Sequence, residues 1–106
     1  MKANRGFRLH PLAGRDITGI WRYIAEDNIF AAGRMREEIL REIRALVEFP
    51  HQGYQRPQLT SRPLRFKPVR EYVIAYAPDK KPLWVVAVFH GRRDPRVIAA
   101  MLRGRE

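Results

Sequence analysis

The sequence predicts a single α+β domain in which a helical hairpin packs on a small antiparallel sheet. The chain has 106 residues, which is enough for one hydrophobic core. Apolar residues recur at helical spacing up to position 48, whereas from position 64 they alternate or run together as they do in strands. Prolines and polar residues fill the interval between these two halves. We therefore expect residues 1–106 to form one domain.

The first half of the chain predicts a short strand followed by two helices. Phe7–His10 reads as the strand, and it is followed by a helix from Leu12 to about Asp27. Asp27 or Asn28 can cap a second helix, which runs from about Ile29 to Glu48 and ends at Phe49-Pro50. Helices joined by so short a turn lie antiparallel. Their inner faces are predicted to contribute Ile17, Trp21, Ile24, Ile39 and Ile43 to the core.

The second half predicts a loop, three strands and a final helix. Residues 50–63 contain three prolines and a glycine and are expected to form the loop. Residues 64–67 and 72–76 alternate as strands do, while Leu83–Phe89 is apolar throughout and should be a central strand that buries Val86 and Val88. Asp94-Pro95 is typical of a helix start. The expected order is β-α-α-β-β-β-α.

The charge of the chain predicts an anionic partner. The formal net charge is +10, and residues 50–106 hold twelve basic and four acidic side chains. A field of this sign attracts nucleic acid, an acidic protein segment or anionic lipid. The alternative interpretation is a surface whose charge serves only solubility.

Residue patterns for conventional enzyme chemistry are not found in the sequence. Cysteine is absent, and the three histidines lie about forty residues apart, so no metal site is expected. Ser61 lacks a nucleophile motif, and the glycines form no phosphate-binding loop. We therefore expect no cofactor and no small-molecule substrate. The longest apolar run, Leu83–Phe89, is far shorter than the roughly 20 residues of a membrane span, so we expect a soluble, cytoplasmic protein that works by binding.

A basic cluster around the predicted sheet is the best candidate site. Adjacent strands could bring residues of this cluster together, where they could bind a phosphate backbone or dock an acidic peptide. With His90 as acid or base they could also stabilise phosphoryl transfer. The alternative is a set of charged residues on a solvated strand face. The candidate residues are Arg65, Lys67, Arg70, His90, Arg92 and Arg93.

Four segments of the chain resemble ParE-type toxins of the RelE/ParE superfamily. They are FRLHPLAGRDITGIWRYIAEDN, LVEFPHQG, LRFKPVREYVIAY and VVAVFHGRRDP, and the resemblance extends from Phe7 to about Leu102. These toxins belong to type II toxin–antitoxin modules and have long been described as plasmid stabilisation proteins. The resemblance implies a β-α-α-β-β-β-α fold, in agreement with the order expected from periodicity. The chain departs from the pattern common in these toxins at Ile29, where many members have proline, and at Arg70-Glu71, where many have glycine.

The resemblance also implies partners and a mode of action. It implies a cognate, ParD-like antitoxin, a small DNA-binding protein with an acidic, flexible C-terminal segment. Members of the ParE branch are associated with inhibition of DNA gyrase by binding, without a catalytic residue. The alternative is the RelE branch, whose members cleave mRNA on the ribosome; here Arg65, His90 and Arg92 would be the catalytic candidates. His90 is followed by Gly-Arg-Arg-Asp-Pro and a predicted helix rather than by a terminal tyrosine, which favours the ParE branch.

Overall fold

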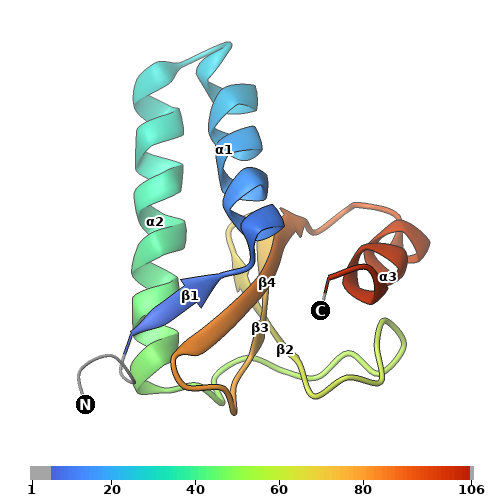
Figure 1. The fold of residues 1–106 in the computed structure, drawn as a ribbon. Coiled ribbons are helices and arrows are strands. Elements are labelled where there is room, and N and C mark those ends of the chain that lie inside the picture. The colour runs from blue at the N-terminus through green and yellow to red at the C-terminus, as the bar shows by residue number, and fades with distance from the viewer. Residues whose placement is uncertain (1–5, 106) are drawn as a thin grey trace.

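The computed structural model describes residues 6–105, which form three helices and a four-stranded sheet (Figure 1). The predicted α+β class and the order β-α-α-β-β-β-α are confirmed. The elements are β1 (Phe7–Leu9), α1 (Pro11–Ala25), α2 (Ile29–Glu48), β2 (Arg65–Val69), β3 (Tyr72–Ala77), β4 (Leu83–His90) and α3 (Pro95–Arg103).

Side-chain caps determine where the helices begin. His10 Nδ1 accepts a hydrogen bond from the backbone N–H of Leu12 at 3.0 Å, and Pro11 occupies the first turn of α1, one residue earlier than expected. Of the two possible caps of α2, Asn28 is the one used: its Oδ1 accepts from the N–H groups of Phe30 and Ala31, each at 3.0 Å. Asp94 caps α3 in the predicted way.

The sheet is mixed rather than wholly antiparallel. The strand order is β1-β4-β3-β2, with β2, β3 and β4 antiparallel to their neighbours. β1 pairs parallel to β4, with Phe7 opposite Leu83. The other edge of β4 is covered by β3, and β1 must lead directly into α1 through His10, whose N–H donates to Val85 O at 2.8 Å. These two constraints fix the position and the direction of β1.

Two cores lie on opposite faces of the sheet. The helical hairpin α1–α2 covers one face, and α3 together with Leu59 and Leu64 of the long loop covers the other (Figure 1). Along β4, Val86 faces α3 and Val88 faces the hairpin, because a register shift between Ala75 and Tyr76 leaves Val86 as an extra residue. Both valines are buried, as are Ile17, Ile39 and Ile43 of the hairpin.

The expectation that Trp21 lies in the core is wrong. Trp21 is half-buried and lines a cleft on the outer side of the hairpin together with Ile29, Phe30 and Gly33. Figure 1 shows why: the hairpin extends beyond the end of the sheet, so residues near its tip have only the partner helix to pack against. Ile24 is also half-buried, at the margin of the hairpin core.

A buried tyrosine ties the long loop to the sheet. The hydroxyl of Tyr76 donates to Pro50 O at 2.7 Å and accepts from the Gly53 N–H at 2.9 Å. Burial raises the pKa of this hydroxyl. A Cβ atom on Gly53 would lie 2.6 Å from the Tyr76 hydroxyl, so this close approach requires glycine. The start of the predicted loop, although irregular in backbone conformation, is therefore held against the sheet by the Tyr76 hydroxyl.

Candidate functional site

A groove lies between the helical hairpin and the end of the sheet where β3 begins and β4 ends. Its volume is about 970 Å³. We call it the hairpin groove. It is lined by Arg15, Asp16, Gly19, Ile20, Tyr23, Ile24, Ala31, Arg34, Met35, Glu38, Arg70, Glu71, Tyr72, Phe89, His90 and Arg93.

The floor of the hairpin groove is apolar. It is formed by hydrophobic side chains of all the flanking elements, including Ile20 and Met35 from the two helices and Tyr72 from β3. Gly19 keeps one wall open, since a Cβ atom there would meet nothing within 4 Å. Tyr23 stands at the rim with 72% of its surface exposed. A ligand can therefore bury apolar surface here.

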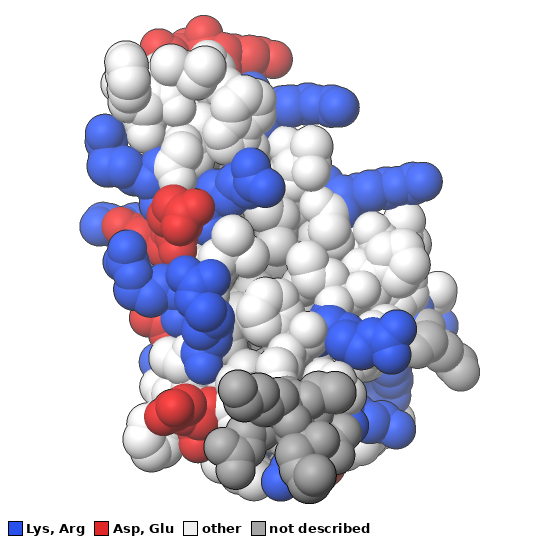
Figure 2. All heavy atoms as spheres, turned by 60° about the vertical axis from the view of Figure 1, so that its left-hand side comes forward, with Lys and Arg blue, Asp and Glu red and all other residues white. Residues whose placement is uncertain are grey.

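Three arginines give the hairpin groove its positive charge. Arg15, Arg34 and Arg93 line it, and none of them takes part in an ion pair among residues 6–105. Of the three acidic residues in the lining, Asp16 and Glu38 are paired with arginines. Figure 2 shows basic side chains spread over the hairpin, with acidic ones at its tip and between them. The unpaired cations suit an anionic ligand.

Arg70 forms a two-point ion pair across one end of the hairpin groove. Its Nε and Nη2 donate to the two carboxylate oxygens of Glu38 at 2.6 and 2.9 Å. The Arg70 guanidinium holds the pKa of Glu38 below its ordinary value. The pair joins the β2–β3 turn to α2, and Arg70 is thus already engaged by a residue of its own chain.

Arg70 adopts the left-handed conformation, with φ 55°. Glycine takes up this conformation without the steric cost that a Cβ atom brings. A glycine in this turn, as the resemblance to ParE-type toxins implies, would avoid that cost.

We expect Arg70→Gly to be more stable than Arg70→Ala. Both variants lose the pair with Glu38, but only alanine retains the backbone strain, so the Tm of the glycine variant should be higher by roughly 4–8 °C. Thermal unfolding followed by circular dichroism measures the difference. Equal Tm values would show that φ at position 70 carries no cost.

His90 lies at the end of β4 and is fixed by two contacts. Its ring meets that of Tyr72 edge-on, with centroids 5.4 Å apart. Its Nδ1 accepts a hydrogen bond from the backbone N–H of Arg92 at 3.1 Å. Burial, followed by the charge of Glu71, raises the pKa of Tyr72, so its hydroxyl remains neutral. His90 is thus held as a strand-end side chain beside a buried ring.

The structure brings together only part of the predicted basic cluster. Arg70, His90 and Arg93 line the hairpin groove, and the exposed Arg92 follows His90 directly. Arg65 and Lys67 lie elsewhere on β2: Arg65 Nη1 donates to Gly53 O at 2.7 Å and Lys67 Nζ to Gln52 Oε1 at 3.4 Å.

The expectation that Arg65 lies near His90 and Arg92 is wrong. Strand β3 lies between β2 and β4, and on it Arg65 is opposite Tyr76 whereas His90 is opposite Tyr72. Arg65 and His90 are therefore separated by four residues along the strand direction, about 13 Å, and by two strand spacings across the sheet.

Sequence reasoning missed the contribution of the helices to the hairpin groove. Arg15, Gly19 and Tyr23 recur every four residues on α1, and Ala31, Arg34 and Glu38 follow helical spacing on α2. These stripes lie beside the core stripes and could have been recognised as a second, mixed face. Their small members, Gly19 and Ala31, are the sequence signal of a hollow.

Within residues 6–105, histidine, aspartate and glutamate side chains do not gather in a group of three that could hold a metal ion. None of the helices in this range combines the length and apolarity needed to cross a bilayer. The hairpin groove, with its mixed apolar and basic lining, is therefore our candidate site.

The domain is thus a helical hairpin over a small sheet, with a groove lined partly by arginines at their junction. Residues 7–95 match the sequence model of the family described as "ParE toxin of type II toxin-antitoxin system, parDE". The chain belongs to this family and is the toxin component of a type II toxin–antitoxin system, which implies a cognate antitoxin partner. A comparison with curated proteins gave no match.

Proposed function

We propose that this toxin inhibits DNA gyrase by binding and that the acidic C-terminal segment of a ParD-like antitoxin neutralises it. The observation that carries the antitoxin part is the hairpin groove, where three unpaired arginines surround an apolar floor. The gyrase part rests on membership of the ParE family, whose members generally act by binding. We also propose a cytoplasmic location, where the toxin would meet these partners.

An amphipathic acidic segment matches the hairpin groove in shape and charge. Apolar side chains of such a segment would lie on Ile20 and Met35, and its carboxylates would meet Arg15, Arg34 and Arg93. A segment that is flexible when free pays an ordering cost on binding, which contacts along the length of the groove can offset. The charge surplus of the chain, +10, accelerates the encounter.

The register of the sheet supports binding over RNA cleavage. A ribonuclease of the alternative branch needs its basic residues and its acid or base around one phosphate. Here Arg65 is hydrogen-bonded to Gly53 O, while His90 lies at the other end of the intervening strand. Arg92 uses its backbone, not its side chain, to contact His90.

Replacing His90 by glutamine tests the mode of action. Glutamine keeps a hydrogen-bond acceptor for the Arg92 N–H but cannot titrate, so inhibition of gyrase supercoiling should change less than about threefold. A ribonuclease that uses His90 as acid or base should instead lose roughly 10²–10⁴-fold in rate. The purified toxin and its variant are assayed in parallel for inhibition of supercoiling and for cleavage of mRNA on translating ribosomes.

We expect supercoiling to be inhibited and the mRNA to remain intact. Arg93→Gln is the matched control, because it removes one charge from the hairpin groove without touching His90. Ribosome-dependent cleavage that disappears in His90→Gln, with gyrase unaffected, would overturn the proposal in favour of the RelE-like alternative.

A further inference from the structure

The turn that joins β3 to β4 forms a second basic surface at the opposite end of the sheet from the hairpin groove. The groove lies where Tyr72 pairs with His90, whereas this turn follows Ala77 and precedes Leu83. A cavity of about 310 Å³ beside the turn is lined by Arg8, Lys80, Lys81, Pro82 and Trp84. The two sites are separate, so that a ligand at one leaves the other open.

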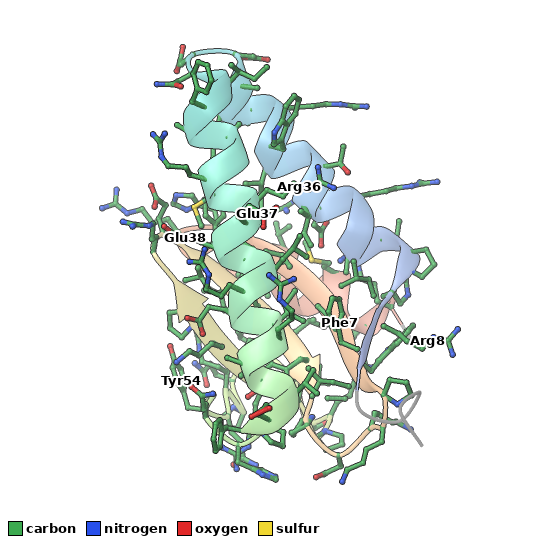
Figure 3. All side chains as sticks on the ribbon, turned by 90° about the vertical axis from the view of Figure 1, so that its left-hand side faces the viewer. Phe7, Arg8, Arg36, Glu37, Glu38 and Tyr54 are labelled. Atoms are coloured by element: carbon green, nitrogen blue, oxygen red, sulfur yellow. The ribbon has the colours of Figure 1, made fainter. Side chains whose placement is uncertain are left out.

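The cations of this surface are unpaired. Arg8, Lys80 and Lys81 are exposed, and none of them joins an ion pair or a side-chain hydrogen bond among residues 6–105. The lining of the cavity contains no acidic residue. Figure 3 shows Arg8 pointing away from the body of the molecule, to the opposite side of β1 from Phe7. Asp79 precedes Lys80 in the same turn, but its carboxylate contacts His51 Nε2 at 3.6 Å and does not line this cavity. The three cations around the cavity attract an anion.

Aromatic side chains flank these cations on both sides. Trp84 is opposite Arg8 in the β1–β4 register and is half-buried, with its ring centroid 5.8 Å from that of His10. On the other side of the lysines, a second cavity of about 320 Å³ is lined by Lys80 and Lys81 together with Phe49, which is 64% exposed. Glu48 is the acidic residue in that second lining. Basic side chains therefore lie beside one exposed and one half-buried aromatic ring at this turn.

We propose that this turn patch, defined as Arg8, Phe49, Lys80, Lys81 and Trp84, binds single-stranded nucleic acid. Lys80, Lys81 and Arg8 hold phosphates, and an unstacked base lies on the indole of Trp84. An acidic peptide would use the cations but not the ring, whose negative face repels carboxylates. A duplex keeps its bases stacked inside and cannot present one to Trp84. The proposal is independent of the antitoxin and gyrase assignments.

Binding of fluorescein-labelled oligo(dT)₁₂ to the full chain, measured by anisotropy over a range of salt, tests the patch. Lys80→Gln/Lys81→Gln should weaken binding about tenfold or more at low salt and reduce the slope of log K against log salt by roughly 1.4. The matched control is Arg22→Gln/Arg44→Gln, which removes the same charge from two exposed positions of the hairpin outside both surfaces and should change affinity less than about twofold. Equal losses in the two double variants would mean that net charge alone binds the oligonucleotide, and the proposal would be wrong.

Tryptophan fluorescence tests the stacking contact. The chain has two tryptophans, so in Trp21→Phe the emission comes from Trp84, and oligo(dT)₁₂ should quench it. Trp84→Leu keeps an apolar side chain but should lower the affinity for oligo(dT)₁₂ about fivefold or more. An abasic twelve-mer has no base to stack, so it should bind this variant and the parent protein equally well. Unchanged Trp84 emission on binding, or an abasic chain that binds as tightly as oligo(dT)₁₂, would overturn the proposal even if the leucine variant failed to fold.

Discussion

Replacing Arg105 by methionine should destabilise the domain by about 3–5 kcal/mol, because it leaves Asp16 without its counter-ion. The two side chains are only 9% and 14% exposed. Their contact is bidentate, with Nη1 to Oδ2 at 2.6 Å and Nη2 to Oδ1 at 3.0 Å. Removing one partner of such a buried pair costs much more than removing an exposed one.

The side chains of the ion pair also form hydrogen bonds with backbone groups of β4 beyond the point where β1 ends. Asp16 Oδ2 accepts from the Val88 N–H at 3.0 Å, and Arg105 Nη1 donates to Val86 O at 3.1 Å. Val86 is the extra residue of β4, and among residues 6–105 β1 pairs with this edge only as far as Val85. The side chains take the place of a strand there, so the variant would also leave a buried carbonyl unsatisfied.

Arg103→Met is the matched control for Arg105→Met. Arg103 lies two residues earlier, is exposed and takes part in no ion pair among residues 6–105, so its loss should change stability by less than about 0.5 kcal/mol. Urea denaturation measures both. Equal losses of stability in the two variants would mean that the buried pair contributes no more to stability than an exposed arginine does.

The pKa of His10 gives a second readout for Arg105→Met. Burial and then the charge of Arg105 hold this pKa below its ordinary value, and Asp16 opposes them. Without Arg105 the pKa should rise, as NMR titration of the imidazole would show. An unchanged pKa would mean that the variant has moved Asp16 away as well.

Local signals in the sequence were sufficient for most of the fold. The helix caps Asn28 and Asp94 and the apolar strand before His90 act over a few residues, so their consequences can be worked out from neighbours alone. The parallel pairing of β1 and the pair between Asp16 and Arg105 could not be predicted in this way, because they join segments more than seventy residues apart. The assignment of Trp21 to the core was wrong for the same reason, because tertiary packing decides whether the sheet extends as far along the hairpin as this residue.

The candidate site was predictable only where strand ends define it. Near the strand ends that meet at one end of the sheet lie Arg70, His90 and Arg93. The basic pattern around them was enough to identify this end of the sheet. Arg65 belongs to the same pattern, but the sequence does not say that β3 separates its strand from β4. Arg34 lies among charged residues of the second helix, where nothing in the sequence marks it, and it lines the groove only because the hairpin packs beside the end of the sheet.

Reversing two charges of the hairpin groove should largely abolish antitoxin binding. In Arg34→Glu/Arg93→Glu, carboxylates would face the acidic segment proposed to lie there, and like charges across an interface cost several kcal/mol. The affinity for a peptide of the antitoxin's acidic C-terminal segment should fall at least about 100-fold. Isothermal titration calorimetry at low and at moderate ionic strength measures the loss, which should persist when salt screens the long-range attraction.

A control with the same net charge separates contact from general attraction. Arg22→Glu/Arg44→Glu reverses two exposed arginines, one on each helix of the hairpin, that do not line the hairpin groove. Because distant charges act mainly on the association rate, this variant should lose less than about tenfold at low salt and recover at moderate salt. Circular dichroism confirms that both double variants are folded. If the two lost affinity to the same extent at both ionic strengths, the acidic segment would be attracted by the whole basic surface, and the hairpin groove would not be its binding site.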